Sequence, residues 1–206
     1  YIDKKQKHGL IFDFDFSETK NLAYATLEHK LQFENSEDIL KSTRGGALTY
    51  TYRNSFYATH ALKIEYRSSS INDTIVSLNP NYYGEGNKAQ QYGIISYQFT
   101  ADHRDYVGYP LRGYYFSTDV TKLGISNKDD VNKLDLNATF AGYISLQRNF
   151  FISNNTLGFW STRDGLAYAN YSALGYRKQF VRGYEIYLIE GPYYFLNKTT
   201  FKKRIF

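Results

Sequence analysis

The sequence predicts an all-β protein whose antiparallel strands form a transmembrane β-barrel. Apolar and polar residues alternate with a period of two in about ten segments, the pattern of strands with one apolar face. Aromatic residues make up 18% of the 206-residue chain, and Tyr recurs near segment ends, where the aromatic girdle of a barrel lies. The mean hydropathy is −0.53, and no run approaches the ~20 apolar residues of a membrane helix. A helical membrane protein is therefore excluded, whereas strands with a single apolar face average to a polar sequence.

The first segment shows the alternation most clearly. Phe12, Phe14 and Phe16 fall on one face, and Asp13 and Asp15 fall on the other. The predicted strands cover residues 8–17, 22–34, 44–54, 58–71, 91–103, 112–124, 135–149, 155–168, 184–190 and 193–206. Clusters of turn-forming residues separate several of them, and no segment shows sustained helical periodicity.

The lengths of the segments favour a membrane barrel over a soluble β-sandwich. Sandwich strands alternate in the same way but usually span about five or six residues. Several segments here run to ten residues or more, which suits tilted strands that cross a bilayer. The polar faces also carry many charges: in 58–71, Leu62, Ile64 and Tyr66 oppose Lys63, Glu65 and Arg67. Such faces are typical of a barrel that encloses water.

The residue types that carry chemistry show no catalytic or metal-binding pattern. The absence of Cys excludes disulfides, thiol catalysis and Cys-based zinc sites. Four histidines have no shared ligand spacing, so we expect solvated strand and loop positions for His8, His29, His60 and His103. Asp13 and Asp15 lie about 7 Å apart along one face, compatible with an acid/base pair but equally with a polar lumen. Without a phosphate-binding loop or a nucleophile motif, we expect no enzyme activity, no cofactor and no metal.

The net charge of +5 is modest and spread along the chain. One short basic cluster, Lys202, Lys203 and Arg204, has no recognised nucleic-acid module around it. We therefore expect no nucleic-acid partner.

A first motif joins two predicted strands between Thr100 and Val120. It consists of Asp102, Arg104, Asp105, Pro110 and Gly113, followed by a new alternating strand. The residues alone allow two interpretations. One is a hairpin turn with solvated charges. The other is a turn at a membrane edge, in which Arg104 and Asp105 secure the backbone before the next strand.

A second motif is the run Val181, Arg182, Gly183 and Tyr184, followed by Glu185. Gly183 suits a sharp turn because it takes positive φ without steric cost. The turn does not require Arg182 beside it. A guanidinium offers five donors in a rigid fork, which matches a carboxylate.

Together and in this order, the two motifs resemble those of the BamA/TamA outer-membrane insertase superfamily, also called the bacterial surface antigen family. Its members carry a D-x-R-D…P…G strand-turn-strand element and a V-R-G-F/Y signature at the tip of a long inward-folding loop. The resemblance spans residues 1–206, as a partial outer-membrane barrel domain from the central part of the barrel. It implies about ten strands of a roughly sixteen-stranded barrel, with residues 169–186 as the inward-folding loop.

The resemblance also implies a function and a location. We expect an outer-membrane assembly or insertion factor of a Gram-negative bacterium, which folds or translocates client polypeptides without a cofactor. The implied partners are outer-membrane lipid, client β-barrel or secreted polypeptides, and accessory assembly proteins. Arg182 would pair with an acidic residue of the lumen wall, expected beyond Phe206, with Asp13, Asp15 and Glu65 as open substitutes.

Two alternatives stay open at this point. A passive porin or a dedicated polypeptide secretion pore shares the alternation and the polar lumen. A soluble β-rich glycan-binding or adhesin domain would use exposed Tyr side chains as its binding face.

Overall fold

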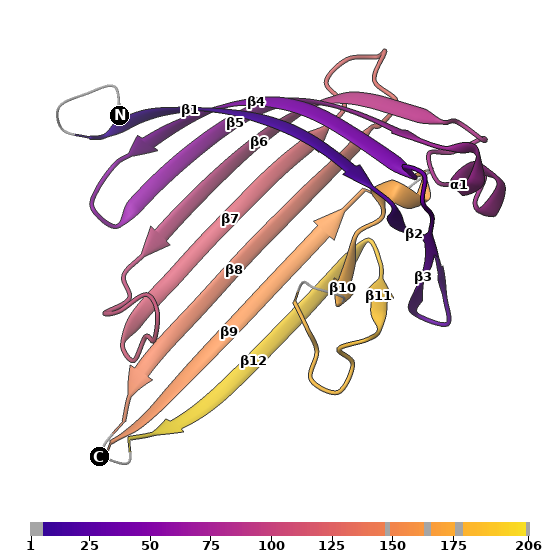
Figure 1. Cartoon of the computed structure of the whole chain (residues 1–206). Coiled ribbons are helices and arrows are strands. Elements are labelled where there is room, and N and C mark those ends of the chain that lie inside the picture. The colour runs from indigo at the N-terminus through magenta and orange to yellow at the C-terminus, as the bar shows by residue number, and fades with distance from the viewer. Residues whose placement is uncertain (1–5, 147–148, 163–165, 176–178, 205–206) are drawn as a thin grey trace.

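Eight strands form one antiparallel sheet that curves into a trough (Figure 1). The computed structural model describes residues 6–146, 149–162, 166–175 and 179–204. In spatial order the strands are β1 (His8–Thr19), β4 (Lys41–Arg53), β5 (Ala58–Ile71), β6 (Ala89–Asp102), β7 (Gly113–Leu123), β8 (Lys133–Ser145), β9 (Phe150–Ser161) and β12 (Tyr193–Lys203). The predicted all-β, antiparallel class is confirmed. The sheet is open, because within the described residues β1 pairs only with β4 and β12 only with β9.

Short turns and long connections lie at opposite ends of the sheet. The turn end holds residues 54–57, 103–112, 146 and 149. The connection end holds residues 20–40, 72–88, 124–132, 162, 166–175 and 179–192. Its connections contain the hairpin β2 (Asn21–Leu27) and β3 (Lys30–Asn35), helix α1 (Asp73–Leu78), the 3-10 turn η1 (Tyr168–Asn170), and the paired strands β10 (Ala173–Gly175) and β11 (Leu188–Glu190). Most of the structure outside the sheet therefore gathers at the connection end.

The alternation of the sequence separates the two faces of the sheet. On the convex face Phe12, Phe14 and Phe16 are 67%, 89% and 62% exposed. On the concave face Glu65 is buried and forms ion pairs with Lys63 (2.6 Å) and Arg67 (2.5 Å). Because cross-strand neighbours share a face, the same division continues across the sheet.

A group of polar side chains lies on the convex face at the border of β9 and β12. Asn154 Nδ2 donates to Asn197 Oδ1 (3.1 Å), and Asn197 Nδ2 donates to Asn154 Oδ1 (3.2 Å). The same two amide groups also donate to Thr199 Oγ1 (2.8 Å) and Thr156 Oγ1 (2.7 Å). The amide donors and acceptors of this ladder are thus satisfied within the ladder itself.

Two predicted strands do not belong to the sheet. The prediction of one strand over 22–34 is wrong, because these residues lie in the separate β2–β3 hairpin. Its turn consists of Glu28 (φ 49°) and His29 (φ 63°). Positive φ at both central residues is the conformation of a type I′ hairpin turn. The Asn-Gly pair that usually marks such a turn is absent. The apolar–polar alternation of the sequence continues through Glu28 and His29, and for this reason the pattern predicted one strand. The predicted strand 184–190 shortens to β11, and the ten predicted strands reduce to eight in the sheet.

Helix α1 is also absent from the sequence prediction. It has six residues, too few for the helical period to show. The Asn72 side chain caps it by accepting the Ile75 N–H at 3.1 Å. Within the described ranges, no helix has the length and apolar character needed to cross a membrane.

A small hydrophobic cluster, the connection core, joins three of the connections. It consists of Leu40, Ile71, Ile75, Tyr82 and Tyr83. Leu22 and Tyr24 of β2 pack against it, as do Tyr168 and Ala169 of the last connection. Hydrogen bonds reinforce the packing, since Asn79 Nδ2 donates to the Tyr24 carbonyl (2.6 Å) and the Tyr168 N–H donates to the Asn81 carbonyl (3.0 Å). Burial raises the pKa of Tyr83 to about 12, so this phenol stays protonated and donates to Ser69 Oγ at 2.8 Å.

Replacing Ile75 by Ala should lower the free energy of unfolding by about 2–5 kcal/mol, because the side chain is fully buried in the connection core. Urea unfolding followed by circular dichroism measures this change. Leu78→Ala is the matched control, since Leu78 lies on the same helix but is 42% exposed. The control should change stability by less than about 1 kcal/mol, and equal losses in both variants would contradict this role of the core.

Candidate functional site

The described residues of the connection between β9 and β12, 166–175 and 179–192, fold over the concave face of the sheet. Lys133 Nζ on β8 donates to Ser172 Oγ at 2.6 Å. Gln90 on β6 and Asn170 are both buried and exchange two amide hydrogen bonds of 3.2 Å. These contacts hold the first half of the connection against the inner wall.

The β2–β3 hairpin holds the second half of the same connection. The Leu188 N–H donates to the carbonyl of His29 at the hairpin tip (2.7 Å). Thr26 Oγ1 donates to Glu190 Oε1 (2.9 Å), and Lys30 Nζ lies 5.5 Å from the ring centroid of Tyr187. The hairpin, predicted as a strand of the sheet, instead secures the connection over the trough.

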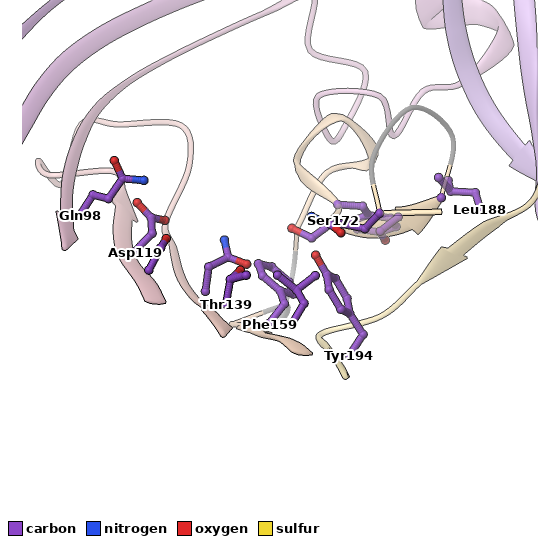
Figure 2. A pocket seen from close by; sticks show the side chains of 14 residues that line it. Gln98, Asp119, Thr139, Phe159, Ser172, Leu188 and Tyr194 are labelled. Carbon is purple, nitrogen blue, oxygen red and sulfur yellow. The ribbon is translucent and has the colours of Figure 1, made fainter. Parts of the chain in front are cut away.

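The sheet and this connection enclose an open hollow of about 810 Å³ on the concave side. Figure 2 shows a row of side chains from Gln98 through Asp119 and Thr139 to Phe159 and Tyr194, with Ser172 and Leu188 of the connection beside its aromatic end. The rings of Phe159 and Tyr194 stack with centroids 4.8 Å apart. The remaining sheet residues of the hollow are Ser117, Asn137 and Leu157.

The side chains that line the hollow can form hydrogen bonds to water or to a polar ligand. Amides and hydroxyls supply neutral donors and acceptors, and Asp119 is the acidic residue among the lining side chains. Its Oδ1 accepts a hydrogen bond from Thr121 Oγ1 (3.1 Å). Within the described part of the chain, no group of three or more His, Asp or Glu residues is arranged to hold a metal.

The second motif lies on the same connection. Gly183 has φ 85°, and its N–H donates to Glu185 Oε1 at 3.0 Å. This hydrogen bond, with a smaller contribution from the charge of Arg182, holds the pKa of Glu185 below its usual value. The Tyr184 N–H donates to the Val181 carbonyl (2.9 Å), so residues 181–185 form a tight local turn.

Arg182 is exposed in this turn. Among the residues that the structure describes, no carboxylate forms an ion pair with its guanidinium, and that includes Asp13 and Asp15. Glu65, the third substitute considered, already pairs with Lys63 and Arg67. The pairing of Arg182 with a carboxylate of the inner wall stays a prediction.

The first motif forms the β6–β7 turn, at the turn end of the sheet. Arg104 donates two hydrogen bonds to Asp102, from Nε to Oδ1 (2.8 Å) and from Nη2 to Oδ2 (2.6 Å). Its Cζ atom lies 4.8 Å from the ring centroid of Tyr115. Asp105 Oδ1 accepts the N–H groups of Tyr106 (2.9 Å) and Leu111 (3.0 Å). Backbone donors, that of Leu111 first, hold the pKa of Asp105 below its usual value. The two acidic side chains thus shape the turn, and the two motifs lie on connections at opposite ends of the sheet.

Sequence reasoning missed a band of His and aromatic rings near the turn end. His8 Nδ1 and His60 Nδ1 lie 2.6 Å and 2.8 Å from the hydroxyls of Tyr50 and Tyr97. The ring of His103 stacks between those of Tyr57 and Tyr114, with centroids 4.4 Å and 4.7 Å away. These histidines are not isolated solvated side chains, although the Tyr residues at segment ends already indicated an aromatic girdle.

A scan against models of known protein families and a search of curated proteins each find no match to this chain.

The first motif yields a test of its glycine. Gly113 has φ 95°, and a Cβ there would lie 2.0 Å from the His103 carbonyl oxygen. Gly113→Ala should therefore lower the free energy of unfolding by at least about 1–3 kcal/mol, from the left-handed conformation alone. Gly158→Ala is the control, because a Cβ there meets no atom within 4 Å. Urea unfolding compares the two, and an unchanged midpoint for Gly113→Ala would contradict the close approach.

Proposed function

We propose that the chain is part of an outer-membrane β-barrel that assembles or inserts client polypeptides. The observation that carries this proposal is the β9–β12 connection, which bears Val181–Tyr184. Its described residues lie over the polar concave face of a sheet with an apolar convex face. This arrangement agrees with the long inward-folding loop expected from the motifs.

The convex face supports a membrane location. Phe14, Phe195 and Phe201 are 89%, 72% and 75% exposed. Soluble monomers rarely expose apolar patches larger than a few hundred Å², and each Å² of apolar surface removed from water stabilises by about 25 cal/mol. Lipid is the environment that such a face matches. The band of His and aromatic rings suits the membrane–water interface, where rings with one polar edge gather.

The edges of the sheet suggest the mechanism. In lipid, each unpaired backbone group costs several kcal/mol, so β1 and β12 require partner strands on their free sides. Further strands of a roughly sixteen-stranded barrel would supply permanent partners. Client strands that pair transiently at such an edge would bury their own backbone groups as they enter the bilayer. This exchange needs no cofactor.

Arg182 has a defined role in this proposal. In the complete barrel its guanidinium would pair with an inner-wall carboxylate and hold the connection in place over the hollow. Gly183 supplies the turn that presents it. The connection would then stay inside the barrel while the edge strands exchange partners.

A polypeptide secretion pore or porin is the second candidate. The mainly uncharged, polar lining of the 810 Å³ hollow favours it, because amides and hydroxyls hydrate a passage without binding ions strongly.

The test compares Arg182→Ala with Arg112→Ala, an exposed arginine of the β6–β7 turn that is not one of the five residues of the first motif. Cells that depend on the protein are fractionated, and the amounts of other outer-membrane barrels are measured. We expect the protein in the outer membrane, a severalfold loss of other barrels with Arg182→Ala, and little change with Arg112→Ala. Unchanged barrel levels in both variants would favour the pore. Recovery of the protein in the soluble fraction would rule out both membrane proposals.

A further inference from the structure

A second pocket, the rim pocket, lies at the turn end between the β6–β7 turn and the end of β12. Lys202 Nζ donates to the Pro110 carbonyl at 3.4 Å and lies 4.2 Å from the ring centroid of Tyr109. The pocket has a volume of about 250 Å³ and is lined by Tyr109, Leu111, Phe151, Lys202, Lys203 and Arg204. It belongs neither to the hollow nor to the second motif.

Lys202 and Arg204 supply the positive charge of the rim pocket. Lys202 is half-buried, and Lys203 and Arg204 are exposed. The six lining residues include no carboxylate. Asp105, the acidic residue of the facing turn, directs Oδ1 to the N–H groups of Tyr106 and Leu111. An anion in the pocket would therefore meet an uncompensated positive charge.

The backbone holds these cations in place. The Arg204 N–H donates to the Asn149 carbonyl at 2.9 Å, and β12 pairs with β9 up to the partners Lys203 and Phe150. Lys203 Nζ also lies 5.3 Å from the ring centroid of Phe150. Lys202 and Lys203 are successive residues of β12, so their side chains leave opposite faces of the sheet. Lys202 and Arg204, two positions apart, are therefore the cations that share the rim pocket, and a bound anion would relieve the repulsion between them.

The shape and the lining indicate the class of anion. The ammonium group of Lys202 and the guanidinium group of Arg204 match a phosphate, which accepts several charge-assisted hydrogen bonds at once. A volume of 250 Å³ holds several groups of the size of a water molecule, about 30 Å³ each, so a phosphate and the atoms next to it fit. Tyr109, Leu111 and Phe151 add an apolar wall beside the cations.

We propose that the rim pocket binds a phosphate group, presented by the headgroup of an anionic membrane lipid. The apolar wall suits the glycerol and acyl atoms that follow a lipid phosphate. The lipid as source depends on the membrane location proposed above, whereas the phosphate chemistry does not.

The test measures binding of two probes to the protein in an uncharged detergent. The first probe is inorganic phosphate, followed by isothermal titration calorimetry. The second is phosphatidylglycerol in nanodiscs or vesicles of phosphatidylcholine. Lys202→Gln combined with Arg204→Gln should weaken phosphatidylglycerol binding on the order of tenfold or more, because each Lys or Arg near an anionic lipid surface contributes about fivefold. Lys198→Gln is the control, because Lys198 lies on the same strand but outside the pocket. This variant should change binding little.

Each outcome decides the proposal. Binding of either probe that the double variant loses and Lys198→Gln keeps supports the phosphate site. Loss of phosphatidylglycerol binding identifies a lipid source, and loss of inorganic phosphate binding alone identifies a soluble one. Equal weakening by Lys198→Gln would reduce the effect to general charge attraction and overturn the proposal. Absence of binding by both probes would overturn it as well, whether or not the protein resides in a membrane.

Discussion

The packing of three connections around Leu40 and Ile75 is the interaction on which the covered hollow depends. A single curved sheet has no second layer against which to bury its own faces. The protein instead forms its compact hydrophobic cluster at one end, where β2, the α1 segment and the β9–β12 connection meet. That cluster holds the β2–β3 hairpin in position to accept a hydrogen bond from the Leu188 N–H. It therefore helps to position the connection that covers the hollow, although it lies outside the hollow.

The two faces of the sheet impose opposite demands on the same strands. The convex side carries rings such as Phe14, 89% exposed, and the concave side carries charges such as Glu65 between Lys63 and Arg67. A charge buried on the concave side is tolerated only with partners of this kind, because an unpaired buried ion costs several kcal/mol. The alternation therefore places apolar side chains on the convex side and polar or paired charged side chains on the concave side, in addition to following the geometry of the strand.

The sequence predicted the regular part of this architecture and missed the part that depends on contacts between distant residues. The strand over residues 58–71 matches β5 at both ends, because its alternation is a local signal. The turn at Glu28 and His29 lacks the usual turn residues, and helix α1 is too short to show a period. The exchange of hydrogen bonds between Gln90 and Asn170 joins residues 80 positions apart, and no local pattern predicts it. The residues of the two motifs could be found because each motif is a local pattern. The contacts that these residues form with distant parts of the chain could not.

The amide ladder between β9 and β12 has a consequence for how the last strand finds its place. In the observed alignment Asn197 lies opposite Thr156 and Thr199 lies opposite Asn154, and the two amides exchange their hydrogen bonds diagonally. A slip of one residue turns Asn197 to the opposite face and brings Leu196 or Lys198 into its position. The alternation alone permits slips of two residues, since these keep every side chain on its own face. A slip of two residues that places Asn197 opposite Gly158 also places Phe201 opposite Asn154 and separates the two amides. The ladder therefore disfavours a slip in that direction, in an edge strand that follows a long connection.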